Sequence, residues 1–410
     1  MASPTRGGHA PRAPRSLLAR RGASKSDRPD LPLPPRARWV QVAAAISAIV
    51  SIACLLLIAG MWALKQDAPW QPRVDETPVR DLAGVEAFLA SAPPQSSSDD
   101  PAVFVPTGVM IQSLEFKGPY TAQVSGYLWQ RYPLDAADYD RGIVFPEAET
   151  TTMNKVYEAQ QDGEILIGWN FKTLLREQFD YSQYPLDRQQ IWLRMWHVDF
   201  ERNVFLVPDF EGYATMDPSV LPGVDAGVVL ENWDLDLSYF SYRPTTYSAD
   251  FGIEGYDPRT PQPELYFNVG IERNVLNPLI SRAIAPIVIL LQLFVIVMVI
   301  GRDNKRLEQF GVRPGAVLFT CAAFIFAVLV AQNSLRDEVK WHGIVYLELL
   351  HVITYFVILG VAANSVLLVA KPEYALFHRG NTIVRLVYWP LIMVTFLLLT
   401  VGVLEIDAGV

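Results

Sequence analysis

The residue types that usually carry reaction or metal chemistry are sparse in this chain. None of its five histidines lies at metal-ligand spacing from another. The sequence holds no Gly-rich phosphate loop and no Gly-x-Ser-x-Gly elbow. The paired carboxylates Asp99 and Asp100 lie in a stretch of Pro and Ser, where we interpret them as solvated. We therefore predict that the protein is not an enzyme, and we assign it no metal and no cofactor.

Asp187 and Arg273 are the charged residues with the most specific placement. Asp187 lies in the segment Tyr184–Gln189, where Pro185 restricts the backbone, and Arg273 is the last charge before a long apolar run. If the two side chains meet and are buried, removing one partner costs on the order of 3–5 kcal/mol. Such a pair would suit a contact that transmits motion. The alternative is that both are ordinary charges at a membrane interface.

Five apolar runs predict membrane-spanning helices. The chain has 410 residues, 51% of them hydrophobic, and a mean hydropathy of +0.19, which is typical of a protein with several spans. The first run is longer than the roughly 7–15 apolar residues of a signal-peptide core, which favours a retained anchor over a cleaved signal. The predicted spans are Trp39–Leu64, Leu279–Ile300, Gly315–Gln332, Gly343–Ala370 and Ile383–Val403.

A β-rich region separates the first apolar run from the other four. It consists of short segments in which apolar and polar residues alternate, such as Ala122–Trp129, Glu164–Trp169 and Gln190–Trp196, and which Pro, Gly and Asp interrupt. This period of two predicts an antiparallel β-sandwich. Both cysteines, Cys54 and Cys321, fall in apolar runs, so the sandwich must fold without a disulfide.

These patterns divide the chain into five regions. The N-terminal region is rich in Arg, Pro, Ser and Gly, which predicts disorder. The region after the anchor has a short predicted helix at about Pro78–Ser91, followed by a flexible joint rich in Pro and Ser. The regions are a basic tail (1–38), the anchor (39–64), a linker (65–101), the β-sandwich (102–275) and a four-helix membrane domain (276–403).

The charge distribution predicts the orientation of these regions. Residues 1–38 carry nine Lys and Arg, and the loops 301–313 and 371–382 are also net basic, which places all three in the cytoplasm. The β-sandwich then lies outside. Residues 66–272 carry 13 Lys and Arg against 33 Asp and Glu, without a basic stripe, which argues against a nucleic-acid partner. The acidic surface either attracts cationic ligands or is simply solvated.

Several motifs, taken in order, resemble the pentameric ligand-gated ion channel family in its prokaryotic form, which lacks the loop disulfide. The segment Phe179–Gln189 resembles the signature loop of the family, and Glu177 and Ile191 stand where eukaryotic members have the two cysteines. The other matching motifs are Phe145-Pro146-Glu147, Asn232-Trp233-Asp234-Leu235, Pro263–Asn274, Pro286, Asn333-Ser334-Leu335 and Trp389-Pro390-Leu391. The earliest motif lacks the expected Trp.

The resemblance implies a homopentamer in a bacterial inner membrane that passes inorganic ions when a small-molecule agonist binds. Agonists of this family bind among aromatic rings between neighbouring sandwiches, and such rings suit a cationic amine. The matching residues here are Trp129 from the facing subunit, Phe145, Trp196, Tyr242, Tyr247, Phe251 and Tyr256. The alternative is that these rings belong to the sandwich core.

The resemblance also assigns coupling and pore residues. Coupling would use Pro185, Asp187, Arg273 and Leu335, and the segment Leu335–Val339 would join the second and third membrane helices and touch the signature loop. Spacings of three and four residues put the expected pore-lining residues on one helix face, which would close by dewetting. These are Gly315, Phe319, Ala322, Phe326, Val330 and Asn333. The ion selectivity stays open, and the apolar face leaves a non-conducting sensor with the same fold as the alternative.

Overall fold

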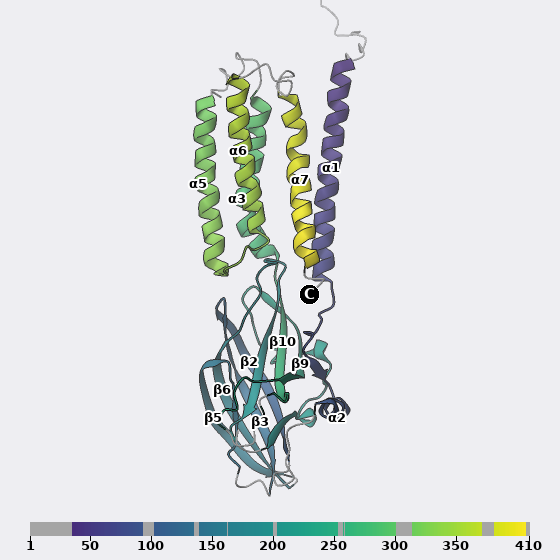
Figure 1. Ribbon diagram of the computed structural model, residues 1–410, viewed down its shortest axis with the longest axis vertical. Coiled ribbons are helices and arrows are strands. Elements are labelled where there is room, and N and C mark those ends of the chain that lie inside the picture. Colours follow the sequence, from purple (N-terminus) through teal and green to yellow (C-terminus); the bar gives the residue numbers. More distant parts are fainter. Residues whose placement is uncertain are drawn as a thin grey trace, which may run out of the picture.

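The computed structural model has a β-rich unit at one end and a bundle of long helices at the other (Figure 1). The predicted tail up to residue 34, the linker residues 93–101 and both basic loops, at 301–313 and 371–380, lie outside the described residues. The structure describes residues 35–92, 102–134, 139–161, 163–199, 203–252, 257, 259–300, 314–370 and 381–406.

The β-rich unit consists of two five-stranded sheets, with the strand orders β1-β9-β10-β7-β4 and β5-β6-β3-β2-β8. Neighbouring strands are antiparallel, apart from the parallel pair of β2 and β8. The first sheet contains β1 (Thr77–Val79), β9 (Trp233–Thr245), β10 (Gln262–Arg273), β7 (Arg188–His197) and β4 (Ile143–Val144). The second contains β5 (Ala148–Gln161), β6 (Glu164–Arg176), β3 (Thr121–Pro133), β2 (Val103–Gly118) and β8 (Val204–Pro208).

One hydrophobic cluster contains buried residues from both sheets, such as Val109 and Leu128 of the second sheet and Phe240 and Phe267 of the first. In β3 every second residue is buried, as the alternating pattern predicts. Burying each large side chain of this kind stabilises the fold by about 1.5–3 kcal/mol. The prediction of a domain built from two mostly antiparallel sheets is confirmed.

Within the part of the chain that the structure describes, five helices are long and apolar enough to cross a bilayer, which indicates a membrane protein. The helix α5 lies at one edge of the bundle, and α1 lies at the opposite edge beside α7, with α3 and α6 between them (Figure 1). The five are α1 (Pro35–Gln66), α3 (Leu276–Val299), α5 (Pro314–Val339), α6 (Glu348–Ala370) and α7 (Thr382–Ile406). A short helix, α2 (Leu82–Ser91), and two 3₁₀ turns, Phe210–Gly212 and Pro218–Val220, lie in the β-rich unit.

Several predicted element boundaries are wrong. The helix α6 begins at Glu348 rather than at Gly343. Leu335–Val339 forms the last turns of α5 rather than a connecting loop, because Leu, Arg and Glu favour the helix and no Gly or Pro interrupts it. The chain leaves the helix at Lys340, whose φ is 49°. The linker helix begins at Leu82 rather than near Pro78, because the Asp81 carboxylate accepts the Gly84 N–H at 2.7 Å and caps it.

Candidate functional site

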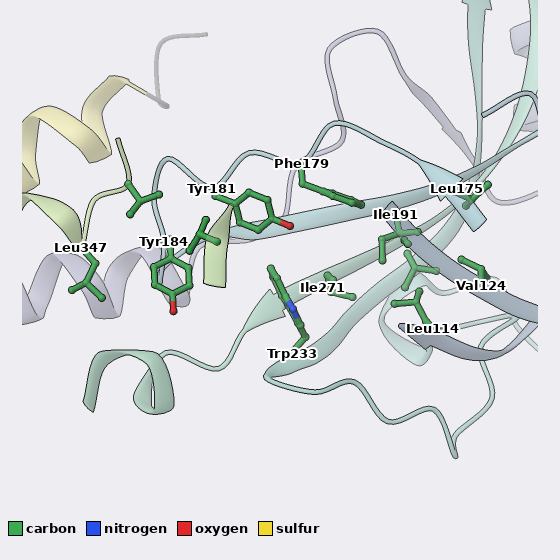
Figure 2. Packing of buried hydrophobic residues seen from close by; sticks show 14 of the residues in the cluster. Leu114, Val124, Leu175, Phe179, Tyr181, Tyr184, Ile191, Trp233, Ile271 and Leu347 are labelled. Atoms are coloured by element: carbon green, nitrogen blue, oxygen red, sulfur yellow. The ribbon is translucent and has the colours of Figure 1, made fainter. Parts of the chain in front are cut away.

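The segment Phe179–Gln189, which we call the signature loop, extends from the sheets to the helices. Its rings Phe179, Tyr181 and Tyr184 are buried, and Pro185 is buried with them. Figure 2 shows these rings lying between the sheet residues Leu175 and Ile191 and the residue Leu347, which precedes α6. The apolar core of the β-rich unit therefore continues through this loop to the helices.

Asp187 and Arg273 form the ion pair that their sequence positions suggested. Arg273 Nε lies 2.6 Å from Asp187 Oδ1, and its Nη2 donates to Oδ2 at 3.0 Å. The side chains are 2% and 10% exposed for Asp187 and Arg273, respectively. Gln189 Nε2 donates to the same carboxylate at 3.0 Å. A bidentate, buried pair of this kind holds the loop in one position relative to the end of β10.

Three aromatic rings surround the Arg273 guanidinium, an arrangement that sequence reasoning missed. The guanidinium carbon lies 3.9 Å from the ring centroid of Trp233, 4.7 Å from that of Tyr184 and 5.9 Å from that of Tyr181. Such cation–π contacts are worth about 0.5–2 kcal/mol each. The contact with Trp233 could have been predicted from the pairing of β9 with β10, because Arg273 and Trp233 lie directly opposite each other on these strands.

The signature loop is bonded to the segment that joins α5 to α6, residues 340–347, which we call the α5–α6 loop. The Tyr346 N–H donates to Ser182 O at 2.8 Å, and the Leu347 N–H donates to Tyr184 O at 3.2 Å. A further sheet loop reaches the same segment, because the Tyr120 hydroxyl lies 3.0 Å from His342 Nδ1. These backbone hydrogen bonds join the β-rich unit directly to the residues that precede α6.

The end of α5 also contacts the signature loop through side chains. The Tyr184 hydroxyl donates to Glu338 Oε1 at 3.1 Å, and Glu338 pairs with Arg282 of α3. Burial raises the pKa of Tyr184, and the nearby Glu338 raises it further, so the hydroxyl keeps its proton and remains a donor. Leu335 is fully buried and lies in the hydrophobic cluster.

Three of the predicted ligand residues, Trp196, Tyr247 and Phe251, meet in one aromatic cluster. Their ring centroids lie 5.8 Å (Trp196–Tyr247), 6.1 Å (Trp196–Phe251) and 5.1 Å (Tyr247–Phe251) apart. The buried carboxylate of Glu264 orients two of the rings, because Trp196 Nε1 donates to it at 2.7 Å and the Tyr247 hydroxyl donates to it as well. Thr245 Oγ1 donates to its second oxygen at 2.7 Å.

The charged groups beneath this aromatic cluster are two carboxylates and one guanidinium. Arg194 pairs with Glu147 and, at 3.3 Å, with Glu264. Burial raises the pKa of Glu147 more than the neighbouring Arg194 lowers it. The guanidinium carbon of Arg194 lies 5.3 Å from the Trp196 ring centroid. The cluster therefore combines partly exposed electron-rich rings with two carboxylates that pair with Arg194.

The other predicted ligand residues lie apart from this cluster. Phe145 and Tyr242 are 3% and 1% exposed, and Tyr242 stacks on Phe88 of α2 at 4.8 Å, so within this chain both are core residues and not surface contacts. Trp129 lies on the second sheet, where it packs over Gly108 and donates to Asp209 Oδ2 at 2.7 Å. Tyr256 lies outside the described residues.

All six predicted pore residues lie on the exposed face of α5. Phe319 and Phe326 are 79% and 67% exposed, and the residues on the opposite side, such as Cys321 and Val328, are buried against the bundle. The exposed residues are Gly315, Phe319, Ala322, Phe326, Val330 and Asn333. A single chain thus leaves an apolar helix face without a protein neighbour.

Among the described residues, no group of three or more His, Cys, Asp or Glu side chains is placed to hold a metal ion. No family model matches the chain, and a comparison with curated proteins finds no significant match. The assignment of function therefore rests on the geometry above and on the order of the motifs.

Proposed function

We propose that the chain is the subunit of a homopentameric ligand-gated ion channel, in which the β-rich unit binds a small molecule and controls a pore lined by α5. The observation that carries this proposal is the bonding of the signature loop. Its Asp187 pairs with Arg273, which leads into α3, and its backbone accepts hydrogen bonds from the α5–α6 loop. A displacement of the sheets would therefore move α3 through Arg273 and move α5 and α6 through the α5–α6 loop.

The exposed face of α5 supports the pore assignment. Five copies of this face around an axis would enclose a narrow apolar channel with two rings of Phe, at positions 319 and 326. Hydrophobic constrictions of this kind close by dewetting, so a small outward movement of α5 opens them to water and ions. The six pore residues carry no charge, and the proposal therefore assigns no preference between cations and anions.

The aromatic cluster supports a cationic amine as the agonist. Trp196, Tyr247 and Phe251 would supply one side of the site, and Trp129 of the neighbouring subunit would supply the other. Each favourable ring contact with a cation is worth about 0.5–2 kcal/mol. The proposed location is a bacterial inner membrane, with the N-terminus in the cytoplasm and the β-rich unit on the outer side.

A non-conducting sensor with the same fold is the second candidate. The observation that favours it is the apolar face of α5, which offers no polar group to a passing ion between Gly315 and Val330. In that case the β-rich unit would bind its ligand and signal through a partner protein rather than through ion flux.

Currents through planar bilayers distinguish the two candidates. The purified protein is recorded at low and neutral pH with a panel of primary and quaternary amines. Gated single-channel steps would support the channel, and reversal potentials would then give the selectivity. Trp196→Ala should weaken the response to the amine, whereas Trp192→Ala, on the same strand but outside the aromatic cluster, should not. Silence with every amine, from protein whose pentameric mass is verified, would favour the sensor.

A further inference from the structure

The N-terminal helix α1 has no part in the proposed channel, and yet it ends at the junction between the sheets and the helices. Trp62, in its last turn, packs against a small buried cluster that consists of Leu186, Val275 and Tyr346. These three residues come from the signature loop, from the segment between β10 and α3, and from the α5–α6 loop, respectively. The end of α1 therefore packs against a cluster to which all three of these segments contribute.

A hydrogen bond fixes Trp62 to the α5–α6 loop. Its Nε1 donates to the Tyr346 hydroxyl at 3.0 Å, and the two rings meet edge to face with their centroids 6.0 Å apart. The Tyr346 hydroxyl also lies 2.7 Å from Thr400 Oγ1 of α7. Tyr346 is the residue whose N–H donates to Ser182 of the signature loop. One residue thus joins α1, α7 and the signature loop.

A second contact holds the carboxyl end of α1. Arg188, directly after Asp187, donates to the carbonyl oxygens of Gln66 and Ala68, the latter at 2.5 Å. The last carbonyls of a helix lack partners within the helix and carry its partial negative charge, so a guanidinium stabilises them. Through Asp187 the signature loop therefore contacts Arg273, which precedes α3, and through Arg188 it contacts the carboxyl end of α1.

The chain beyond α1 is fixed to the first sheet. Trp70 packs edge-on against Tyr239 with the centroids 5.5 Å apart, and Glu76 pairs with Arg243 at 3.3 Å. The strand β1 then pairs with β9. Within the membrane, by contrast, α1 touches α7, where Ser47 Oγ donates to Leu386 O at 2.6 Å, and most of its remaining surface is exposed. In a bilayer, this exposed apolar surface would face lipid.

We infer that α1 is a regulatory helix that transmits its position in the lipid bilayer to the signature loop, and that Trp62 and Arg188 are the positioning residues for this coupling. A helix that is longer or shorter than the hydrocarbon layer responds to bilayer thickness by tilting or shifting. Because the end of α1 is bonded to the signature loop and to the α5–α6 loop, such a tilt changes how these loops meet. The effect on gating rests on the proposed function, but the mechanical link does not.

Hydrogen exchange of the full-length protein in lipid nanodiscs tests this link without knowledge of the agonist. The reporters are the amides of Tyr346 and Leu347, which donate to the signature loop. We expect Trp62→Ala to speed their exchange by about threefold to tenfold, because the loops then open more often. Leu64→Ala, at an exposed position two residues away, is the matched control and should leave both amides unchanged. Arg188→Gln should act in the same direction as Trp62→Ala.

Bilayer thickness separates a regulatory role from a merely structural one. In myristoleoyl and in erucoyl phosphatidylcholine, the wild-type protein should exchange these two amides at different rates, and Trp62→Ala should abolish the difference. Cleavage of an inserted protease site at residues 71–74 should preserve the difference, because the side-chain contacts remain. Equal rates in both lipids for the wild-type protein, or exchange that Trp62→Ala does not change, would overturn the inference. If the protein conducts no ions, only the channel proposal fails, and the exchange rates still decide the role of α1.

Discussion

The buried Asp187–Arg273 pair is the most consequential contact at the scale of single residues. We expect Asp187→Ala or Arg273→Ala to leave the pentamer intact but to impair gating. Each should lower the free energy of unfolding by about 3–5 kcal/mol, because one buried charge loses its partner. Arg273→Ala should cost more than Asp187→Ala, since it also removes the cation–π contacts with Trp233 and Tyr184. Denaturant unfolding and bilayer currents measure the two effects.

A surface ion pair provides the control for this prediction. Arg176 lies 3.2 Å from Glu149, but its side chain is 71% exposed, so Arg176→Ala should cost no more than about 1 kcal/mol. The double variant Asp187→Ala/Arg273→Ala should be less destabilised than the sum of the single variants, because it leaves no unpaired charge. Additive losses, or normal gating in both single variants, would contradict a coupling role.

The buried side chain of His197 should make the free energy of unfolding depend on pH. Its Nδ1 accepts the Asp199 N–H at 3.2 Å, which leaves Nε2 to donate to the Tyr132 hydroxyl at 2.9 Å. Burial lowers the pKa of His197 from 6.5 to about 4. Because the unfolded chain binds this proton at a higher pH, the free energy of unfolding should fall as pH drops from about 6.5 to about 4, by up to about 3 kcal/mol.

Comparison with His197→Gln isolates this contribution. Glu147 and Glu177 have raised pKa values, mainly because of burial, and they act in the opposite direction as pH falls. Both carboxylates are present in the wild-type protein and in the variant, so the difference between the two unfolding curves reports His197 alone. A difference that is constant between pH 4 and pH 6.5 would show that the histidine does not titrate in this range.

The sequence predicted single residues well only where one pattern determined the outcome. Asp187 and Arg273 could be singled out because each is a charge beside a membrane segment. The role of Glu264 could not, because a carboxylate that collects donors from Trp196, Tyr247 and Thr245 depends on three strands or loops meeting. The sequence predicts Tyr242 as a ligand residue, but it is a core residue because Phe88 of α2 covers its face of β9. The alternation of apolar and polar residues does not show that a helix covers this face.

At the scale of elements, the exposed face of α5 yields the next prediction. Phe319→Ser or Phe326→Ser should increase the leak current. Five serine hydroxyls around the axis would hold water in a constriction that rings of Phe would dewet. Cys321→Ser, on the buried side of the same helix, is the matched control and should add no leak. If neither Phe variant changes the current, this face does not line the pore.

The helices and most strands followed from hydrophobic period and length, but their ends did not. The apolar run stops at Gln332 and predicts a helix end there, whereas α5 continues through Asn333–Val339. Polar residues at this end are stabilised by contacts that no local pattern encodes, such as Arg336 Nε with Glu348 Oε1 at 2.5 Å. The helix thus projects beyond its apolar part to meet the signature loop through Glu338.

At the scale of the whole molecule, many of the contacts that the structure describes between the β-rich unit and the membrane helices lie beside the signature loop. Arg273 leads into α3, and Tyr346 precedes α6. Glu338 lies in the last turn of α5, and Trp62 lies near the end of α1. The described helices of one chain do not enclose a channel, because the six predicted pore residues face away from the bundle. Assembly is therefore the property on which the proposed function depends most.

Deletion of residues 1–64, with a cleavable signal in their place, separates assembly from coupling. We expect pentamers to persist, because α1 lies beside α7 at the opposite edge of the bundle from α5 (Figure 1). The amides of Tyr346 and Leu347 should nevertheless lose protection, because Trp62 and its hydrogen bond to Tyr346 are removed. Native mass spectrometry counts the subunits, and hydrogen exchange on the same sample reports the loops. Loss of pentamers would instead give α1 a role in holding the subunits together, and intact protection of both amides would leave it without a role at the junction.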